Sequence, residues 1–326
     1  MTSLHSIYSS LLIANIARHY GLTYFDIGSR GGFQDDLYPI AFAVDAVGFE
    51  PDPVEFKRLQ SRSPRPWKTV TYLPHGISDQ TGQRILHIPT DPQSASLLKH
   101  NLTIGEKFDK PQFFEINRTE KIETLCLNDA LEKTEFTSID YMKIDIEGAE
   151  LPVFKSSSEV MKDLLAIKTE VSFVPFRENQ PLAGEVDFHL KQAGFELMDI
   201  NGPHHWRRHG YLVHPYYSNE NPPYSKGQIV QADYLYFRNP NSLEGDIDKL
   251  LRLSLISMSF GYFDHSLMIL ERQEISEFLY AEFGCSPIQI VAPASKAYGR
   301  KAFLRAFYRQ GRNLVPFVRY FRNLLA

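Results

Sequence analysis

The sequence has little cysteine and no long hydrophobic run. Only Cys126 and Cys285 occur among the 326 residues, and their separation matches no metal-binding or redox motif. A disulfide framework is therefore not expected, which fits a reducing compartment. No stretch approaches the roughly 18 consecutive apolar residues that span a bilayer, and no basic N-terminus precedes a long apolar core. These absences predict a cytoplasmic protein without a signal peptide.

The sequence also lacks the two common motifs that bind nucleotide phosphates. A glycine-rich turn, Gly28-Ser29-Arg30-Gly31-Gly32, follows the apolar stretch 22–27, but its glycines do not have the G-x-G-x-x-G spacing of dinucleotide-binding proteins. No G-x-x-x-x-G-K-[ST] loop occurs either. A glycine turn directly after a strand still brings the backbone close to a ligand. The pattern therefore favours a ligand without a pyrophosphate.

Acidic residues are absent from the last part of the chain. Residues 296–326 contain eight basic residues and no acid, namely Lys296, Arg300, Lys301, Arg305, Arg309, Arg312, Arg319 and Arg322. Because the whole chain has a formal charge of −4, residues 1–295 carry −12. An acidic body argues against a nucleic-acid-binding protein. The composition, with 43% hydrophobic and 23% charged residues, is otherwise that of a globular protein.

Strand and helix patterns alternate over most of the chain. Period-two and apolar runs predict strands at 22–27, 41–49, 70–74, 84–88, 113–125, 139–146, 164–171, 195–200 and 231–238. Helical spacing predicts helices at 4–19, 55–61, 126–131, 149–155, 185–193 and 243–283, and from 295 to the end. The strand at 113–125 is expected at a sheet edge, and the last two strands as an antiparallel pair. This order is typical of a doubly wound α/β sheet.

Three segments are predicted: an N-terminal helix at 1–21, an α/β domain at 22–240 and a helical extension at 241–326. Residues 91–105 are expected to be loop. The stretch 201–227 is rich in Pro, Asn, Tyr and His, and we interpret it as a lid or specificity insert. Pro287 and Pro293 predict a linker, and Pro316 predicts a kink in the basic tail.

Polar residues follow three of the strands. The glycine turn comes after the first strand, Glu50 ends the second, and Asp145 and Glu147 end the strand at 139–146. If that strand continued far enough, the two carboxylates would share a face. The carboxyl ends of parallel strands line one crevice. An acid about 20 residues after a glycine turn suits a ribose diol, so the ligand should be a nucleoside, and S-adenosylmethionine fits.

Three blocks of sequence resemble the signature blocks of the FkbM-type methyltransferases. They are Phe25 to Gly32, Gly48 to Pro53, and Asp140 to Glu150. The resemblance covers roughly residues 22–238 and implies a seven-stranded, mostly parallel Rossmann-like sheet with one antiparallel strand. One departure is Arg30, where the family usually has a small polar residue. Arg30 would either change the geometry of the cofactor site or point outward.

The resemblance implies S-adenosyl-L-methionine as the cofactor and a hydroxyl-bearing acceptor, often a sugar, glycan or polyketide. Carried over by motif position, the first block would frame the methionine end, Glu50 would bind the ribose, Gly76 or Ile77 would border the adenine, and Asp145 would lie beside the transferable methyl group. The cofactor-binding residues expected on this basis are Asp26, Gly28, Ser29, Arg30, Gly32, Glu50, Pro51, Gly76, Ile77 and Asp145.

Methylation of a hydroxyl requires a base, because the pKa of an alcohol lies far above 7. We rank Asp145 first, Glu147 second and Glu170 third, with His204 or His205 as alternatives. The competing roles are holding the cofactor ammonium for Asp145 and fixing loops for the two glutamates. A divalent metal bound by these three carboxylates would lower the pKa of the alcohol, but the leading prediction includes no metal.

The basic tail at 296–326 has two interpretations. It could lie as an amphipathic helix on an anionic membrane, which gives a peripheral association with the inner face of a membrane. Equally, it could pack on the acidic body or close a homodimer. The main rival to an enzyme is a methyltransferase fold that has lost turnover and acts as a scaffold through this tail. A methyltransferase that acts on nitrogen or carboxyl groups is a third alternative.

Overall fold

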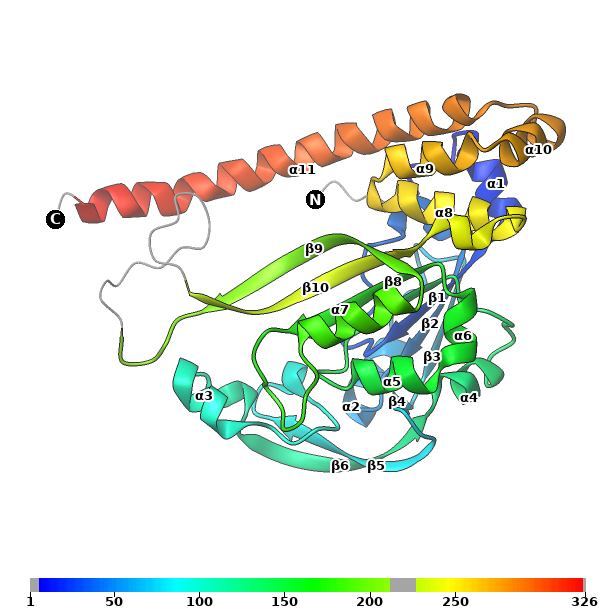
Figure 1. Cartoon of the computed structure of the whole chain (residues 1–326). Helices are drawn as coiled ribbons and strands as arrows, with labels where there is room; N and C mark the ends of the chain where they lie inside the picture. Colours follow the sequence, from blue (N-terminus) through cyan, green and yellow to red (C-terminus); the bar gives the residue numbers. More distant parts are fainter. Residues whose placement is uncertain (1–5, 212–226, 325–326) are drawn as a thin grey trace. The chain divides into compact units, whose positions relative to one another are not determined.

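The computed structural model describes residues 6–211 and 227–324 (Figure 1), and the chain divides into two compact units. One unit contains Met1–Gly21, Gln34–Ala43 and Asp246–Ala326, and the other contains Leu22–Phe33 and Val44–Gly245. The sequence suggested an N-terminal helix and a C-terminal extension as separate segments. The structure instead groups both segments in one unit, which also includes residues 34–43.

The larger unit is built on a seven-stranded sheet. Its strand order is β3 (Thr69–Leu73), β2 (Val44–Phe49), β1 (Leu22–Ile27), β7 (Tyr141–Ile144), β8 (Ala166–Ser172), β10 (Gln228–Arg238) and β9 (Phe195–Trp206). β10 runs antiparallel to both β8 and β9, and the other neighbouring strands pair in parallel. The predicted Rossmann-like sheet with one antiparallel strand is confirmed.

A second sheet contains β4 (Gly76–Ile77), β6 (Ile116–Leu125) and β5 (Gly82–Pro89) in that order. The expectation that β6 lies at the edge of the main sheet was wrong. β6 pairs antiparallel with β5 along its length, and Leu86, Ile88 and Ile122 form a hydrophobic cluster of their own. Because these three side chains are buried against one another, β5 and β6 form a layer of their own instead of adding an edge strand to the main sheet.

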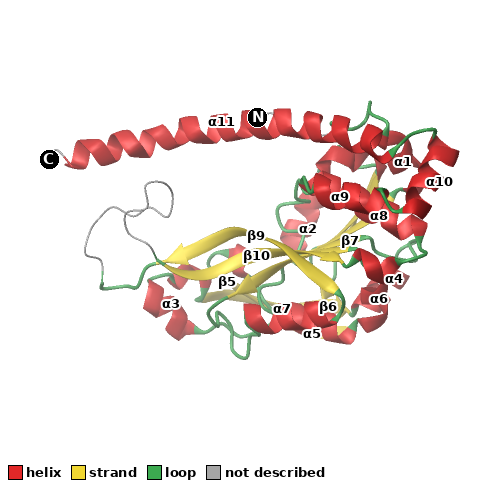
Figure 2. Ribbon diagram, turned by 45° about the horizontal axis from the view of Figure 1, so that its top comes forward, coloured by secondary structure: helices red, strands yellow, loops and turns green. Residues whose placement is uncertain are grey.

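Helices pack against the main sheet of this unit (Figure 2). They are α2 (Pro53–Gln60), α3 (Leu102–Phe108), α4 (Leu127–Glu132), α5 (Glu150–Ser156), α6 (Ser158–Asp163) and α7 (Ala183–Gln192), and the short 3₁₀ turns are η2 (Pro92–Ser94), η3 (Pro111–Phe113) and η4 (Pro240–Leu243). Phe154 of α5 and Leu190 of α7 belong to the same buried cluster as Met142 of β7. The loop predicted at 91–105 is wrong in part, because η2 and the start of α3 lie within it.

The strand β7 ends earlier than the sequence suggested. It stops at Ile144, so Asp145 and Glu147 lie in a turn and do not share a strand face. Glu147 has φ 60° and Gly148 has φ 108°. The Glu150 carboxylate accepts hydrogen bonds from the backbone N–H of Ile146 at 2.9 Å and of Gly148 at 3.2 Å. These bonds hold the turn closed, because they occupy the N–H groups that a longer strand would use.

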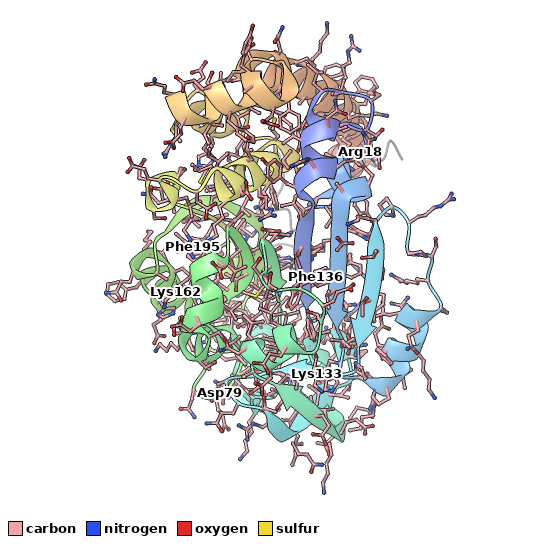
Figure 3. All side chains as sticks on the ribbon, turned by 90° about the vertical axis from the view of Figure 1, so that its right-hand side faces the viewer. Arg18, Asp79, Lys133, Phe136, Lys162 and Phe195 are labelled. Atoms are coloured by element: carbon pink, nitrogen blue, oxygen red, sulfur yellow. The ribbon has the colours of Figure 1, made fainter. Side chains whose placement is uncertain are left out.

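The strand β9 is longer than predicted. It continues to Trp206, so His204, His205 and Trp206 lie in a strand rather than in a loop. Its antiparallel pairing with β10 confirms the predicted hairpin and explains the extension, since His204 lies opposite Gln231. At the other end of β9, the guanidinium of Arg238 lies 3.9 Å from the centroid of the buried Phe195 ring (Figure 3). Residues 212–226 of the predicted insert lie outside the described residues.

The smaller unit is helical. It contains α1 (Ile13–Tyr20), η1 (Tyr38–Ala43), α8 (Ile247–Phe260), α9 (Phe263–Leu270), α10 (Gln273–Phe283) and α11 (Pro287–Leu324). Gly261 with φ 92° and Gly284 with φ 63° end α8 and α10. Among the helices that the structure describes, none is both long enough and apolar enough to cross a membrane.

Two predictions for this unit were wrong. α1 begins at Ile13, and the described residues before it form turns, in which the backbone N–H groups of Ser6 and Tyr8 donate to the carbonyl oxygens of Tyr38 and Pro39. Pro287 and Pro293 do not form a linker. Pro287 starts α11, a position where the missing N–H costs nothing, and α11 continues through Pro293 and Pro316 to Leu324.

Candidate functional site

A cavity of about 470 Å³ opens at the carboxyl ends of the central strands of the larger unit. Each side of it is lined by residues of a different segment. They are Gly28 and Arg30 after β1, Glu50 and Pro51 after β2, Gly76 and Ile77 of β4, Ser94 and Ser96 near η2, Asp145 and Glu147 after β7, Glu170 of β8, Arg177 after β8, His204 and Trp206 of β9, and Gln231 and Asp233 of β10. The cavity has the size of a small-molecule site.

The glycine turn after β1 is packed against the turn after β7. Gly28 has φ 80°, and a Cβ atom at this position would overlap the carbonyl oxygen of Asp145. The backbone N–H of Asp145 donates to the carbonyl oxygen of Ile27 at 3.0 Å. Only glycine allows this approach, and the result is a backbone wall that a ligand can reach closely.

The acid after β2 is buried and faces the cavity. Glu50 is 3% exposed and accepts a hydrogen bond from the backbone N–H of Asp52 at 2.9 Å. Burial raises the pKa of Glu50 to about 7, against the opposing effect of Arg30. The Arg30 guanidinium lies 3.8 Å from Glu50 and 2.8 Å from Asp52, and Arg118 contacts Asp52 from the other side at 2.9 Å. Arg30 therefore borders the cavity and partly neutralises the carboxylates of Glu50 and Asp52, so it does not point outward.

A buried lysine links the first and third signature blocks. The Lys143 ammonium lies 3.3 Å from Asp26 and 3.4 Å from Asp145, and it donates to the carbonyl oxygen of Gly28 at 3.0 Å. Burial lowers the pKa of Lys143, but the two carboxylates outweigh burial and raise it. The ammonium therefore stays charged and fixes the position of Asp145 at the cavity wall.

Glu147 is held by a buried arginine from the loop after β8. Arg177 is 1% exposed and donates to the Glu147 carboxylate at 2.9 Å and to the Ser94 carbonyl oxygen at 2.8 Å. The Glu147 carbonyl oxygen accepts a hydrogen bond from the Ser96 hydroxyl at 2.9 Å. Burial raises the pKa of Glu147 to about 8, although Arg177 opposes this shift. The side chain is thus oriented and titrates near neutral pH.

The surroundings of Glu170 disfavour the charged form of its carboxyl group. Burial raises its pKa well above the usual range, and the nearby carboxylates of Glu147, Asp145 and Glu150 add to the shift. On the adjacent strand Asp233 lies directly opposite Glu170 in the register of β8 and β10. Like charges in this arrangement repel each other, and the Lys168 ammonium, 3.7 Å from Asp233, offsets part of this repulsion.

Asp145, Glu147 and Glu170 form a close group of acids. One oxygen atom from each of the three lies within 4.8 Å of the others. Carboxylate oxygens at this spacing can hold a divalent cation. Two buried cations already lie against the group, however, since Lys143 contacts Asp145 and Arg177 contacts Glu147. The group can therefore carry negative charge without a metal ion.

The cavity also has an aromatic wall. Trp206 stacks on Phe113 with ring centroids 5.7 Å apart and an angle of 14° between the rings, and its ring centroid lies 5.0 Å from that of Phe176. Phe114 packs behind them in a cluster with Phe108. This wall offers a flat apolar surface a short way from the carboxylates.

The structure brings most of the predicted site residues together. The cavity is lined by Gly28, Arg30, Glu50, Pro51, Gly76, Ile77, Asp145, Glu147, Glu170 and His204. Asp26, Ser29 and Gly32 do not line it. Asp26 and Ser29 lie one layer behind, where the Ser29 hydroxyl donates to the Asp26 carbonyl oxygen at 2.6 Å.

Sequence reasoning missed Arg177, Ser96, Trp206 and Asp233 as site residues. Arg177 lies in a loop with no local pattern that marks it as buried. The Ser94-Ala95-Ser96 stretch was expected only as part of a polar loop. The aromatics at 206 and 113 were visible in the sequence, but nothing local indicates that they stack on each other.

The open α/β sheet with a cavity at the carboxyl ends of its strands defines a Rossmann-like methyltransferase fold. The profile of the Methyltransferase FkbM domain matches residues 26–197, which is just over half of the chain. The protein belongs to the FkbM methyltransferase family, and the predicted resemblance is confirmed. Its cofactor is S-adenosylmethionine.

Solved structures of other methyltransferases are similar in a more distant way. A TehB-like SAM-dependent methyltransferase from Corynebacterium glutamicum is 9% identical, with 71% of this chain and 89% of that chain covered and a TM-score of 0.29. A precorrin-6y C5,15-methyltransferase from Geobacter metallireducens is 10% identical, with 69% and 88% covered and a TM-score of 0.30. These scores are too low to support an argument about this site. A search of curated proteins gave no match.

The residues present fit the cofactor. Gly28 leaves room for close backbone contact. The buried Glu50 carboxylate faces the cavity, and among the described residues only the Arg30 side chain is paired with it. A carboxylate accepts hydrogen bonds from both hydroxyls of a ribose. Asp145 and its neighbouring acids offer negative charge to a cationic ligand. Glu50 would hold the ribose, and the turn after β7 would lie at the charged end.

Proposed function

We propose that the protein methylates a hydroxyl group of a sugar, glycan or related small-molecule acceptor. The observation behind this proposal is the composition of the cavity wall beyond the expected cofactor residues. There Glu170, Asp233 and Gln231 lie together with the Trp206 ring. Carboxylates and amides bind hydroxyl groups, and an aromatic ring covers the apolar face of a sugar ring. This combination suits a polyol better than an apolar or an anionic acceptor.

The proposed acceptor residues lie mostly outside the part of the chain that the family profile matches. The profile ends at residue 197, whereas His204 and Trp206 of β9 and Gln231 and Asp233 of β10 follow it. The β9–β10 hairpin therefore supplies a wall that the family profile does not cover. We infer that the hairpin determines which acceptor binds.

S-adenosylmethionine supplies an electrophilic methyl group when it is bound. The remaining requirement is a base for the hydroxyl proton, in reach of an oxygen held roughly 3 Å from the reacting carbon. The structure favours Glu147 over Asp145 for this role. Asp145 is engaged by Lys143, whereas Glu147 is oriented by Arg177 and has a pKa of about 8. A base whose pKa lies near the working pH both holds and releases a proton efficiently.

The other acids then have supporting roles in this proposal. Glu170 hydrogen-bonds the acceptor hydroxyl, and Asp145 stabilises the positive charge of the cofactor. Glu147 would take the proton that the acceptor hydroxyl loses when its oxygen is methylated. His204, which is exposed at the rim of the cavity, contacts the acceptor rather than the reacting oxygen.

The test is methyl transfer from ¹³C-methyl-labelled S-adenosylmethionine to a panel of sugars, oligosaccharides, amines and carboxylic acids. The carbon-13 chemical shift of the product separates oxygen-linked from nitrogen-linked methyl groups, and mild alkali cleaves a methyl ester but not an ether. An alkali-stable methyl ether on a sugar is the expected product. Methylated amines or esters as the only products would overturn the proposal.

Two controls separate the alternatives. Calorimetry with S-adenosylmethionine and S-adenosylhomocysteine is done first, because cofactor binding without transfer to any acceptor class would favour a binding or scaffold protein. The transfer assay is then repeated with EDTA. We expect unchanged activity, since Lys143 and Arg177 already compensate the acids, and a loss that Mg²⁺ restores would assign the three carboxylates to a metal ion instead.

The proton assignment is tested by Glu147→Gln, Glu170→Gln and Asp145→Asn. Loss of a general base lowers kcat by about 10²- to 10⁴-fold. We expect this loss in Glu147→Gln together with disappearance of the ionisation near pH 8 from the pH profile of kcat. If Asp145→Asn instead removes that ionisation while leaving cofactor affinity intact, Asp145 is the base.

A further inference from the structure

The first third of α11 is an integral part of the helical unit. Ile290 and Ala294 are buried, and the Tyr298 ring lies edge-on to Phe263 at a centroid distance of 5.6 Å. A Cβ atom on Gly261, at the end of α8, would contact the same tyrosine ring. Figure 1 shows α11 continuing well past α8 and α9, the helices that hold its start. The helix therefore has a firmly packed base and a long continuation.

The continuation exposes large apolar side chains. Phe303 is 70% exposed, Phe307 is 68% exposed, and Leu304 between them is 39% exposed. Residues four apart lie on the same side of a helix, so the two phenylalanines form one apolar strip. Exposed phenylalanines in this arrangement are unfavourable in water and indicate a surface that is covered in use.

Positive charge accompanies this strip. Arg300 is exposed one turn before Phe303, and Lys301 lies half-buried beside it. Arg305 contacts Asp35 of the same unit at 3.2 Å. The sequence of the helical stretch 308–324 continues the pattern, with arginines at 309, 312, 319 and 322, leucine at 314, valine at 318 and phenylalanine at 321. From residue 296 onward the helix contains eight basic residues and no acid.

We propose that α11 beyond Tyr298 binds an anionic lipid membrane, lying parallel to its surface. Phe303 and Phe307 would enter the boundary between headgroups and acyl chains, and the basic residues would lie against lipid phosphates. The charge selects this partner over a neutral membrane, because seven basic residues without an acid after Tyr298 are complementary to anionic headgroups. The proposal rests on α11 alone and does not depend on the reaction at the cavity.

Geometry and composition both favour lying on the membrane over crossing it. None of the helices in the described ranges is long and apolar enough to span a bilayer. A helix with apolar residues on one side and cations on the other is instead typical of interfacial binding. Each basic residue close to an anionic surface contributes about a fivefold gain in binding.

The experiment is co-sedimentation of the full chain with vesicles. One set is phosphatidylcholine alone, and in the other about a third of the lipid is phosphatidylglycerol. We expect binding to the anionic set only, and a decrease when NaCl is raised from about 0.1 M to 0.5 M, because salt screens the headgroup charge. Equal binding to both sets, or no binding to either, would overturn the proposal.

Two double variants of α11 test the apolar strip and the basic residues separately. Phe303→Ser with Phe307→Ser should weaken vesicle binding about tenfold or more, whereas Phe188→Ser, which alters a side chain 64% exposed on α7, should not. Arg300→Gln with Lys301→Gln should weaken it roughly 25-fold. The control is Lys162→Gln, an exposed lysine on α6 that Figure 3 labels. Unaltered binding in either α11 variant contradicts the proposed surface.

Self-association is distinguished by light scattering at several protein concentrations without lipid. A dimer that dissociates in the Phe303→Ser, Phe307→Ser variant, together with absence of vesicle binding, would assign the strip to a second copy of the chain. Cofactor affinity, measured by calorimetry, should be unchanged in all of these variants. This readout keeps the membrane test independent of the test for methyl transfer.

Discussion

Arg177 and Glu147 form a buried ion pair, with 2.9 Å between Nη2 of the arginine and Oε2 of the glutamate. The same guanidinium donates to both the carbonyl oxygen and the hydroxyl of Ser94. One side chain thus ties the turn after β7 to the segment around η2, two walls of the cavity that are far apart in the sequence. The position of the proposed base depends on this link.

Removing the ion pair between Arg177 and Glu147 should lower the stability of the folded protein. Arg177→Met leaves the Glu147 carboxylate buried without its cation, and loss of one partner of a buried pair costs about 3–5 kcal/mol. The pKa of Glu147 should then rise further, which moves the rising limb of the pH–kcat profile to higher pH. Thermal unfolding and the pH profile measure the two effects. The double variant with Glu147→Gln should lose less stability than the sum of the single variants, and additive losses would show that the pair is not coupled.

Gly28 should tolerate no side chain. Gly28→Ala would place a methyl group against the Asp145 carbonyl oxygen and force an unfavourable φ of 80°. Gly31 is the matched control, because it has φ 87° but no atom within 4 Å of an added Cβ. Gly31→Ala should cost only the backbone strain of about 1 kcal/mol. We expect Gly28→Ala to abolish measurable cofactor binding in calorimetry, and equal effects of the two variants would rule out the close packing as the cause.

Glu50 should determine cofactor affinity. Glu50→Gln retains an acceptor for the Asp52 N–H but loses the charge that binds both ribose hydroxyls. A hydrogen bond to a charged group contributes about 1.5–3 kcal/mol, so the dissociation constant of S-adenosylmethionine should rise about 10- to 100-fold. Asp45→Asn, at a surface ion pair with Lys68, is the control and should leave affinity unchanged. An unaltered dissociation constant in Glu50→Gln refutes the ribose assignment.

The acids of the site should make stability depend on pH. Burial raises the pKa of Glu147 to about 8 and that of Glu150 to about 7, whereas unfolded glutamates titrate near about 4.3. Between these values the folded state keeps protons that the unfolded state has released. Stability of the cofactor-free protein should therefore fall as the pH rises from about 4.5 to 8.

Calorimetric scans at several pH values measure this trend. Glu170→Gln should raise the melting temperature at pH values above about 8 by a few degrees, because it removes one of the repelling carboxylates. The positively charged cofactor should stabilise the protein more at high pH than at low pH for the same reason. A melting temperature that rises steadily over the window would contradict the assigned direction of these pKa shifts.

Trp206 should affect the acceptor and not the cofactor. Trp206→Ala removes the flat surface of the aromatic wall and should raise KM for the acceptor about tenfold or more, with the affinity for S-adenosylmethionine unchanged. Trp206→Phe keeps an aromatic face and should restore part of the loss. Tyr280→Ala, at an exposed aromatic of α10, is the control. A change in kcat alone would place Trp206 outside the acceptor site.

Local sequence patterns were sufficient to predict the cofactor half of the protein. The strand and turn of Phe25 to Gly32, the acid at Glu50 and the turn of Asp140 to Glu150 depend on short apolar runs, glycine and short-range hydrogen bonds. Parallel strands then bring their carboxyl ends to one sheet edge whatever the detailed packing. For this reason the order of strands and turns along the chain already assigns Gly28, Glu50 and Asp145 to one crevice.

The side of the cavity that we propose for the acceptor depends on contacts between distant parts of the chain. β9 extends to Trp206 because β10 offers a pairing partner, and β6 leaves the main sheet because β5 and its hydrophobic cluster hold it. Arg177 is buried because Ser94 and Glu147 accept its hydrogen bonds. These contacts depend on burial of apolar surface and on hydrogen-bond partners that no local pattern specifies. Only the folded structure therefore shows that Lys143 lies against Asp145 and that Arg177 lies against Glu147.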